Sequence, residues 1–399
     1  MRVTMMVRCL AMMRGGGETR HLAWARELAS LGVEVDMVVG VPFVSGRARY
    51  PIETASDTHL TPIGMKIAQI RSPYARDFVY RWQNTPGFGR LTMTALHLDE
   101  EWFCRAAWRR IAASSRRPDI VHAHALHQAA RLRVDQTPVV INLPGAPNPR
   151  YTAALREADA LVADGWAATN LPAALGVAVE RLPKGVDADR FRPDGPSVRD
   201  RLGLRTKRVV LTVARLVPIK NVRRLVDAMA LIRARVADAH LVIVGDGPEA
   251  GALRESVAAM GIADAVTFAG YVPHAQTPDF YRAADAFALS SDFDNSPNVV
   301  LEAMASGLPV VTTDVGGVRE LIVDRTGSTP GAIVVPKDPS AIAAAVERFL
   351  TAPDLAQIAS AFNRSRATTD FSWRASALRL LDVYHRVVSA RRGPARASA

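Results

Sequence analysis

Two carboxylates near the start of one expected helix carry the strongest chemical signal in the sequence. Asp294 and Glu302 are separated by seven residues, and the helix between them is expected to begin near Pro297, because proline is favoured at a first helical position. One carboxylate then precedes the helix and the other lies just over one turn inside it. The pair can accept hydroxyl groups from two parts of one ligand, such as a ribose and a hexose. The free amides of Asn298 and Val299 can face an anion or sugar hydroxyls.

A pair of cations, Arg215 and Lys220, lies between the expected strand 209–213 and the helix that follows it. The carboxyl ends of strands are where open α/β sheets bind ligands. A helix N-terminus adds partial positive charge at the same place. This arrangement predicts a binding place for a diphosphate; the alternative is a salt-bridged pair on the surface.

Three glycines, Gly245, Gly247 and Gly251, form a loose version of a dinucleotide-binding pattern. Their spacing is wrong, and the motif lies in the middle of its domain instead of at the start. No acidic residue ends the next strand, 266–268, to bind a ribose. The pattern therefore argues against a dinucleotide-dependent oxidoreductase and leaves Gly245 as a secondary site candidate.

Two histidines, His122 and His124, end another expected strand. They point to one face, at the edge where sites form. Three interpretations remain open: metal ligands, although no third ligand has convincing spacing; polar residues satisfied in packing; or a contact with a reacting sugar. The pair Asp187 and Asp189 resembles a metal-binding motif, but its position in a turn favours a structural role.

Short apolar strands alternate with helix-length segments along the whole chain, which indicates βαβ units and parallel sheets covered on both faces. Twelve strands are too many for one sheet of usual size, so two doubly wound domains are expected. The strands are 3–7, 33–39, 120–121, 139–141, 160–162, 177–182, 209–213, 241–244, 266–268, 286–289, 310–312 and 333–335. A polar Pro/Gly stretch, 191–196, marks the boundary. Segment 41–95 is the least regular and carries several aromatic residues.

Composition narrows the class of protein. The 399 residues include 49% hydrophobic and 22% charged residues, which excludes disordered and collagen-like chains. No stretch approaches the roughly 20 apolar residues of a membrane span, and the apolar run 9–13 is too short for a signal peptide. Cys9 and Cys104 form neither a metal pattern nor a disulfide framework. A soluble, cytoplasmic protein is expected.

The net charge of +11 is spread over both halves of the chain. It suits an anionic substrate, or peripheral contact with the anionic cytoplasmic face of a membrane. The simpler interpretation is a solvated surface in an arginine-rich protein. No motif of a nucleic-acid-binding fold is present, so nucleic acid is not an expected partner.

In their order and spacing, these motifs resemble those of the retaining glycosyltransferases of family 4, over nearly the whole chain. The matching segments are Gly15-Gly16-Gly17-Glu18, Pro118 to His124, Gly185 to Asp187, Arg190 to Pro193, Arg215 to Lys220, Val244 to Pro248, Ser296 to Met304 and Phe371 to Trp373. The resemblance implies the α/β GT-B fold, two doubly wound Rossmann-like domains facing across a cleft. Residues 1–190 would form the acceptor domain, completed by a helix at 373–388. Residues 191–371 would form the donor domain, and 390–399 a disordered tail.

The resemblance also implies roles. Arg215 and Lys220 would bind the diphosphate of a nucleotide sugar, Glu302 its ribose, and Asp294 the sugar hydroxyls. The Gly16-Gly17 loop would approach the diphosphate. The implied catalytic residues are His124, Asp294, Arg215 and Lys220; the donor-binding residues are Gly16, Gly17, Arg215, Lys220, Asp294, Ser296, Pro297, Asn298, Val299 and Glu302; His122 and Gly245 are secondary.

Four positions depart from the family pattern. Asp294 replaces a glutamate and is one methylene shorter, which would retune donor choice or weaken activity. Asn295 and Asn221 stand where glycine is usual, and Lys184 stands where asparagine is common.

The expected activity is transfer of a hexose-type sugar from a nucleotide diphosphate to an acceptor hydroxyl, with retained anomeric configuration. The acceptor would be a small molecule, a glycan or a glycolipid. The resemblance implies no metal and no cofactor, because fixed cations and helix amides can stabilise the departing diphosphate. Alternatives on the same scaffold are a nucleotide-sugar epimerase or hydrolase, and a catalytically weak nucleotide-sugar-binding protein.

Overall fold

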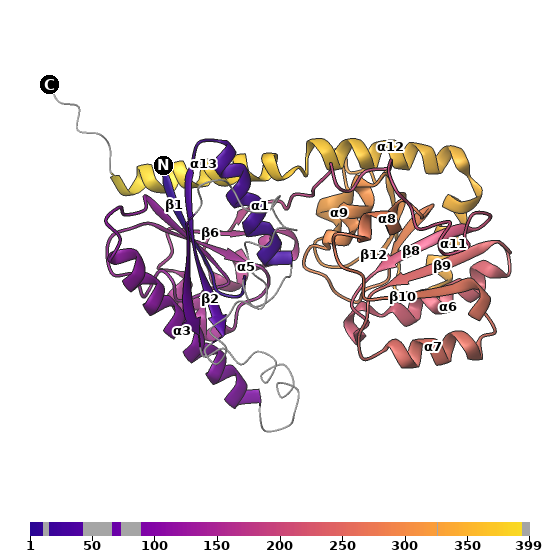
Figure 1. Cartoon of the computed structure of the whole chain (residues 1–399), viewed down its shortest axis with the longest axis horizontal. Helices are drawn as coiled ribbons and strands as arrows, with labels where there is room; N and C mark the ends of the chain where they lie inside the picture. The colour runs from indigo at the N-terminus through magenta and orange to yellow at the C-terminus, as the bar shows by residue number, and fades with distance from the viewer. Residues whose placement is uncertain (11–15, 43–65, 73–88, 325, 393–399) are drawn as a thin grey trace. The chain divides into compact units, whose positions relative to one another are not determined.

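The computed structural model describes residues 1–10, 16–42, 66–72, 89–324 and 326–392 (Figure 1). The chain divides into two compact units. Unit 1 comprises Met1–Pro183 and Ser376–Ala399, and unit 2 comprises Lys184–Ala375. Each unit is a parallel sheet covered by helices, which confirms the predicted α/β class with two doubly wound domains.

The described part of unit 1 contains a seven-stranded parallel sheet in the order β3-β2-β1-β4-β5-β6-β7. Its strands are β1 Arg2–Val7, β2 Glu34–Pro42, β3 Lys66–Ser72, β4 Ile120–His124, β5 Val139–Leu143, β6 Ala160–Ala163 and β7 Glu180–Arg181. Every residue of β1 and β4 is buried, as expected of central strands covered on both faces. The chain order reverses between β1 and β4, which makes their carboxyl ends the topological switch point where ligands bind in such sheets.

The helices of unit 1 cover this sheet. They are α1 Gly16–Ser30, α3 Gly89–Ala112, α4 Thr152–Leu155, α5 Gly165–Leu175 and α13 Trp373–Arg392, with the 3₁₀ turn η2 Pro149–Tyr151. From α3, Phe103 and Trp108 are fully buried in the core. On α13, Ser376 accepts a hydrogen bond from Trp24 Nε1 (2.8 Å) and donates to the carbonyl of Pro183 (2.6 Å). The part of α13 from Ser376 to Arg392 therefore belongs to unit 1.

The described part of unit 2 contains a six-stranded parallel sheet in the order β10-β9-β8-β11-β12-β13. Its strands are β8 Arg208–Val213, β9 Ala239–Val244, β10 Val266–Gly270, β11 Ala286–Leu289, β12 Val310–Thr313 and β13 Ala332–Val335. The order reverses between the neighbouring strands β8 and β11, so their carboxyl ends form the switch point of this unit.

Two hydrophobic cores lie on opposite faces of the unit 2 sheet, because neighbouring residues of its strands alternate between them. Val210 packs in one and Leu211 in the other. The first core takes in α6 Val222–Arg233, α7 Ala250–Ala259 and α11 Pro339–Thr351; the second takes in α8 Thr277–Tyr281, α9 Asn298–Ala305 and α10 Val318–Ile322. The long α12 Pro353–Thr369 and the 3₁₀ turns η3 Pro218–Lys220 and η4 Ala263–Ala265 complete the unit. Figure 1 shows α6 and α7 on one side of the sheet and α8 and α9 on the other.

Three boundaries differ from those expected. The units divide after Pro183 instead of near residue 190, because Val186 donates a backbone hydrogen bond to Phe371 (2.7 Å) and Phe191 is buried in a core of unit 2. The Pro/Gly stretch 191–196 is thus a loop within that unit. Helix α13 continues to Arg392, so 390–392 are helical and not tail; residues 393–399 lie outside the described part.

Strand β3 was not expected. It lies at the edge of its sheet, where Gln69 is exposed between two half-buried apolar residues, Ala68 and Ile70. Its apolar residues are therefore fewer and more scattered than those of the central strands. The aromatic residues of segment 41–95 fall outside the described residues.

Candidate functional site

Two loops meet at the switch point of unit 2, one after β8 and one after β11. The first carries Arg215 and Lys220 into η3 and α6, and the second carries Asp294 into α9. The ammonium group of Lys220 pairs with the Asp294 carboxylate, and both side chains are largely buried. The structure thus brings together the cation and the carboxylate that the sequence places 74 residues apart.

A second network fixes the same two loops. Asn221 Nδ2 donates to Asp292 Oδ2 (3.0 Å), and Arg224 donates to Asp292 Oδ1 (2.8 Å) and to the Ser290 carbonyl (2.6 Å). Partial burial acts to raise the pKa of Asp292, but the hydrogen bonds from Arg224 and Asn221 outweigh it and hold that pKa below its ordinary value. The charged carboxylate is therefore the stable form that ties the β11 loop to α6.

The departure at Asn221 has a local explanation. Its φ of 42° is left-handed, a conformation that asparagine tolerates better than most residues. Its side-chain oxygen also accepts from the Arg224 amide (3.3 Å) and caps α6. Asparagine therefore supplies both the turn usually made by glycine and a helix cap.

Gly245 and Gly247 act through close packing of the backbone. Gly245 has φ of 135°, and a Cβ there would lie 1.8 Å from the Ala214 carbonyl oxygen; one at Gly247 would lie 2.3 Å from that of Leu216. The amides of Ala214 and Leu216 donate to the carbonyls of Val244 and Asp246, each at 3.0 Å. These glycines let the loop that carries Arg215 lie directly on its neighbour.

Arg215 is exposed, and its side chain makes no hydrogen bond or ion pair with any described residue. The alternative of a salt bridge therefore does not hold for Arg215 among the described residues, whereas Lys220 is ion-paired with Asp294. Its guanidinium group remains available to an anionic ligand.

Helix α9 begins at Asn298, so Pro297 is the residue before the helix and not its first residue. No side chain caps this end, which leaves the first amides, including that of Val299, without intrahelical acceptors. Ser296, two residues before the helix, is buried. Its backbone carbonyl accepts a hydrogen bond from the ammonium group of the buried Lys184 (2.6 Å).

Two buried oxygens beside this helix start make no hydrogen bond. They are Oδ2 of Asp294 and Oδ1 of Asn298. Buried acceptors of this kind are uncommon in folded proteins. Both oxygens can accept hydrogen bonds from donor groups of a ligand.

Glu302 lies one turn inside α9, and both of its carboxylate oxygens are bound. His274 Nε2 lies 3.0 Å from Oε1, and the hydroxyl of Tyr281 donates to Oε2 (2.8 Å). Burial and the neighbouring charge of Glu302 raise the pKa of Tyr281 well above its ordinary value, so the phenol keeps its proton. Neither His274 nor Tyr281 was predicted, although His274 follows β10 at the same sheet edge.

The switch point of unit 1 holds the predicted histidines. His122 Nδ1 lies 2.6 Å from the Tyr384 hydroxyl, and His124 Nδ1 lies 3.0 Å from Asn142 Oδ1. Both rings also contact His21 of α1, at centroid distances of 5.1 and 4.4 Å. The predicted common face of β4 is thus confirmed.

Burial, with nearby positive charge, lowers the pKa of His122 to about 3 and that of His124 to about 4. Both imidazoles are therefore neutral at pH 7. His122 is fully buried under Tyr384, which favours the packing interpretation for this residue, whereas His124 retains slight exposure. Close by lies a buried ion pair between Arg20 and Asp164 (2.9 Å), which was not predicted.

The prediction that Gly16 and Gly17 lie in a loop of unit 1 is wrong. Gly16 and Gly17 lie in the first turn of α1, which begins at Gly16; Gly15 lies outside the described residues. Two consecutive glycines disfavour helix, and that preference misplaced the boundary.

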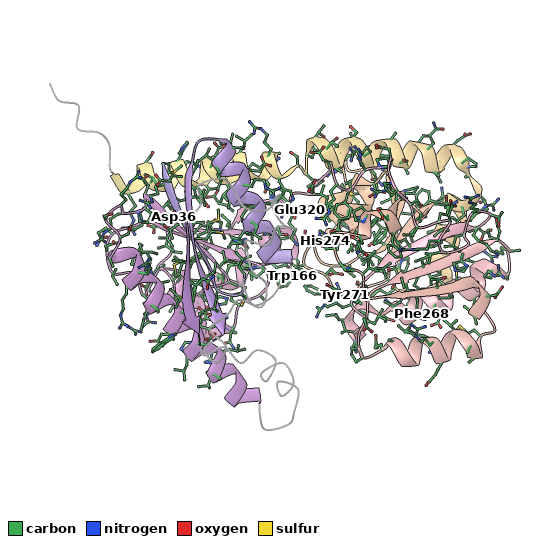
Figure 2. All side chains as sticks on the ribbon, in the orientation of Figure 1. Asp36, Trp166, Phe268, Tyr271, His274 and Glu320 are labelled. Atoms are coloured by element: carbon green, nitrogen blue, oxygen red, sulfur yellow. The ribbon has the colours of Figure 1, made fainter. Side chains whose placement is uncertain are left out.

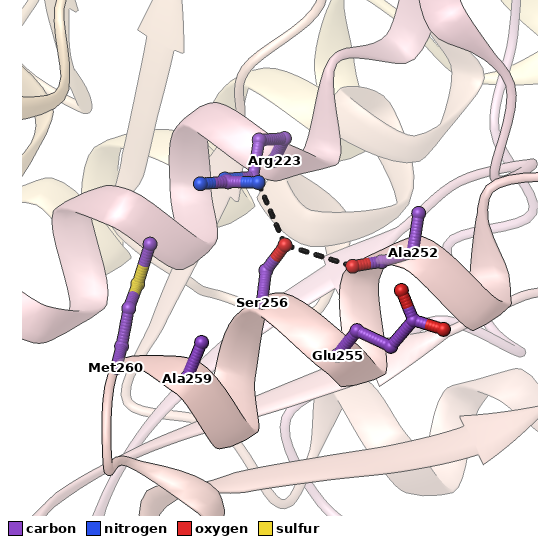
Figure 3. A pocket seen from close by; sticks show the side chains of 6 residues that line it. All are labelled: Arg223, Ala252, Glu255, Ser256, Ala259 and Met260. Atoms are coloured by element: carbon purple, nitrogen blue, oxygen red, sulfur yellow. Dashed lines mark hydrogen bonds between the residues drawn. The ribbon is translucent and has the colours of Figure 1, made fainter.

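A separate hollow lies on the surface of α6 and α7 (Figure 3). Its lining is Arg223, Ala252, Glu255, Ser256, Ala259 and Met260. Arg223 donates to Ser256 Oγ (2.6 Å), which donates to the Ala252 carbonyl (2.8 Å). It contains none of the predicted site residues.

Within the described chain, no three His, Cys, Asp or Glu side chains lie close enough together to hold a metal ion. A separate finding is that none of the described helices has the length and apolar character needed to cross a membrane.

About half of the chain is similar in sequence to known proteins. Residues 196–366 match the model of the family of glycosyl transferases group 1. The GDP-mannose-dependent alpha-(1-6)-phosphatidylinositol monomannoside mannosyltransferase of Mycolicibacterium smegmatis is 36% identical over 216 residues, covering 52% of this chain and 56% of that protein. The D-inositol 3-phosphate glycosyltransferase of Segniliparus rotundus is 34% identical over 212 residues, covering 52% and 46%. The chain thus spans about half the length of the curated relatives it matches.

Solved structures extend the likeness to the whole fold. HepE of Anabaena, in complex with UDP, has a TM-score of 0.70 at 18% identity and covers 97% of this chain and 100% of its own. Sucrose-phosphate synthase from Thermosynechococcus elongatus has a TM-score of 0.71 at 19% identity, covering 98% and 99%. At these identities the likeness is one of fold, and it agrees with the two predicted Rossmann-like α/β domains.

Proposed function

We propose that this protein is a retaining glycosyltransferase of family 4 that moves a hexose-type sugar from a nucleotide-diphosphate donor to an acceptor hydroxyl without a metal ion. The observation that carries the proposal is the ion pair between Lys220 and Asp294. It joins the two loops at the β8/β11 switch point, within the segment that matches the group 1 glycosyl transferases.

The donor would lie along these loops. Arg215 and Lys220 would bind the diphosphate and stabilise the negative charge that develops as it departs. The uncapped start of α9 would add its amides, including those of Asn298 and Val299. This combination of two cations and a helix N-terminus supplies the electrostatic role that a divalent ion has in other phosphate-transfer sites.

The sugar end and the nucleoside end would each contact one carboxylate. Asp294 would accept sugar hydroxyls through its unbonded Oδ2. Glu302 would accept the hydroxyls of the ribose. As the bond to the diphosphate breaks, the anomeric carbon becomes electron-poor, and an acceptor hydroxyl held on the same face would give the retained configuration.

Names of the relatives guide the choice of substrates. The mycobacterial relatives are named GDP-mannose-dependent, and several others are named for inositol phosphate. We propose GDP-mannose as the first donor to test, and inositol-containing glycolipids or small molecules as the first acceptors. The net charge of +11 supports peripheral contact with an anionic membrane when the acceptor is a lipid.

The test is a transfer assay with the full chain, GDP-mannose or UDP-glucose, and a panel of inositol-based acceptors. Formation of a glycoside with the donor's anomeric configuration, read by NMR, supports the proposal. A product of inverted configuration refutes retention. Donor turnover that needs no acceptor indicates a hydrolase or an epimerase instead.

A thermal-shift panel of nucleotides identifies the donor before that assay. A ligand at about ten times its Kd stabilises the folded state by about 1.4 kcal/mol. A selective shift with one nucleoside diphosphate supports the donor site, whereas a response to NAD(H) alone contradicts it.

A further inference from the structure

We infer that His274 is a positioning residue of the donor site. Together with Tyr281 it fixes the carboxylate of Glu302 so that the remaining acceptor positions match two neighbouring hydroxyls of a ribose, and it thereby sets the preference for ribonucleotides over deoxyribonucleotides. This inference rests on the proposed function, because it takes Glu302 as the ribose-binding group.

Two protein side chains hold the carboxylate of Glu302. Its side chain is 10% exposed, and each oxygen has one protein partner, His274 at 3.0 Å and Tyr281 at 2.8 Å. A carboxylate oxygen offers two acceptor positions, so each keeps one for a ligand. With both oxygens held, the carboxylate cannot rotate.

The two partners of Glu302 differ in their exposure to solvent. Tyr281 is fully buried and forms part of the core behind Glu302. The side chain of His274 is 52% exposed, so it forms the solvent-facing side of the same group. His274 is therefore the partner that a ligand at Glu302 would meet.

His274 is itself held in place by its neighbours. Thr277 Oγ1 donates to its backbone carbonyl (3.0 Å), and its ring lies 5.4 Å from that of the buried Phe191. Figure 2 labels His274 in the loop that follows β10, close after Tyr271. A side chain fixed at both backbone and ring can orient another group, because little conformational freedom remains to be lost.

The negative charge of Glu302 is not paired with a lysine or an arginine in the described chain. Because a carboxylate only accepts, the facing Nε2 of His274 must carry a proton. Loss of this donor would leave one oxygen of a largely buried carboxylate without its partner and the group free to turn.

The ligand class follows from the two free acceptor positions. A carboxylate held on both sides matches a pair of neighbouring hydroxyls, one per oxygen, as in the 2′ and 3′ positions of ribose. A 2′-deoxyribose offers only one. The site then distinguishes ribose from 2′-deoxyribose by the number of hydroxyl groups that the carboxylate binds. A carboxylate held in one orientation discriminates between the two sugars better than a mobile one.

The experiment measures Kd by calorimetry for GDP, UDP and their 2′-deoxy counterparts with the full-length protein. Wild-type protein should bind the better ribonucleotide roughly tenfold or more tightly than its deoxy form. His274→Ala and His274→Phe should reduce that ratio to about threefold or less. His274→Gln should keep most of it, because its amide nitrogen can donate from the same distance. His385→Ala, an exposed histidine in unit 1, is the matched control.

A ratio that stays unchanged in both His274→Ala and His274→Phe overturns the inference, since a merely structural histidine alters stability without altering the choice of sugar. The variant Glu302→Gln distinguishes the role of Glu302 in binding the ribose from the role of His274 in orienting Glu302. If it weakens ribonucleotide binding while the His274 variants do not, only the role of His274 falls. If wild-type protein binds no nucleoside diphosphate, the proposed function falls and the inference with it.

Discussion

Lys220 and Asp294 form an ion pair that links the turn after β8 to the loop after β11. The two residues come from neighbouring strands whose order reverses in the sheet, so the pair lies at the position where this topology places ligands. The aspartate is one methylene shorter than the glutamate of the family pattern. Its contact with Lys220 nevertheless leaves Oδ2 buried and unbonded, and thus able to accept a hydroxyl.

Substitution Lys220→Met tests this pair. It removes the cation from the diphosphate and leaves the Asp294 carboxylate uncompensated, so we expect kcat/KM for transfer to fall by about 100-fold or more. Lys207→Met is the matched control, because Lys207 precedes the opposite end of β8. Equal activity of the two variants would remove Lys220 from the donor site.

The fold was predictable from the sequence because its central strands are mostly apolar. Every residue of β1 and β4 is buried, and most of them are hydrophobic, although Thr4 interrupts β1 and two histidines lie in β4. Edge strand β3 has only short apolar stretches between polar residues, and it was missed. The Pro/Gly stretch near 191–196 indicated a loop correctly but not the boundary, since a surface loop within one unit has the same composition as a linker.

Site residues were predictable where position along a strand or helix decided their place. The sequence placed Arg215, Lys220 and Asp294 at strand ends, and the structure brings Lys220 and Asp294 into contact at the shared sheet edge. His274 and Tyr281 could not be assigned to Glu302, which is 28 and 21 residues away. Hydrophobic periodicity identifies the buried face of a segment but not which polar group lies opposite it.

The two buried histidines of unit 1 predict loss of stability in acid. Their folded pKa values, about 3 for His122 and about 4 for His124, are lower than the unfolded value near 6.5. The unfolded chain therefore binds more protons, and the free energy of unfolding decreases as the pH falls from about 6.5 toward 4. The loss should be on the order of 3 kcal/mol per histidine at pH 4. Urea unfolding between pH 7 and 4 measures it.

The variant His124→Gln provides the comparison, because glutamine does not titrate and can keep a hydrogen bond to Asn142. Its unfolding free energy should depend less steeply on pH over that range. His385→Ala, which changes an exposed histidine, should leave the slope as in the wild type. Parallel slopes for wild type and His124→Gln would show that the pKa of His124 is the same in the folded and the unfolded chain, and would contradict the prediction.

Removal of divalent metal should leave transfer nearly intact. Arg215, Lys220 and the amides at the start of α9 are expected to stabilise the departing diphosphate in place of a metal ion. Initial rates with 5′-diphosphate donors, measured in an excess of EDTA and again after Mg²⁺ is restored, check this. Abolition by EDTA with recovery on Mg²⁺ would contradict the metal-independent mechanism.

Substitution Gly245→Ala should destabilise unit 2 and weaken donor binding together. The residue has φ of 135°, and a methyl group there would meet the Ala214 carbonyl oxygen at 1.8 Å, so the backbone after β8 must shift. We expect a loss of about 2–3 kcal/mol in unfolding free energy, with a raised donor KM because Arg215 follows the displaced carbonyl. Gly251→Ala is the matched control: Gly251 lies inside α7 with nothing within 4 Å of an added Cβ, so it should gain about 0.5–1 kcal/mol. If Gly245→Ala is as stable and as active as Gly251→Ala, the close contact between the two loops does not hold Arg215 in place.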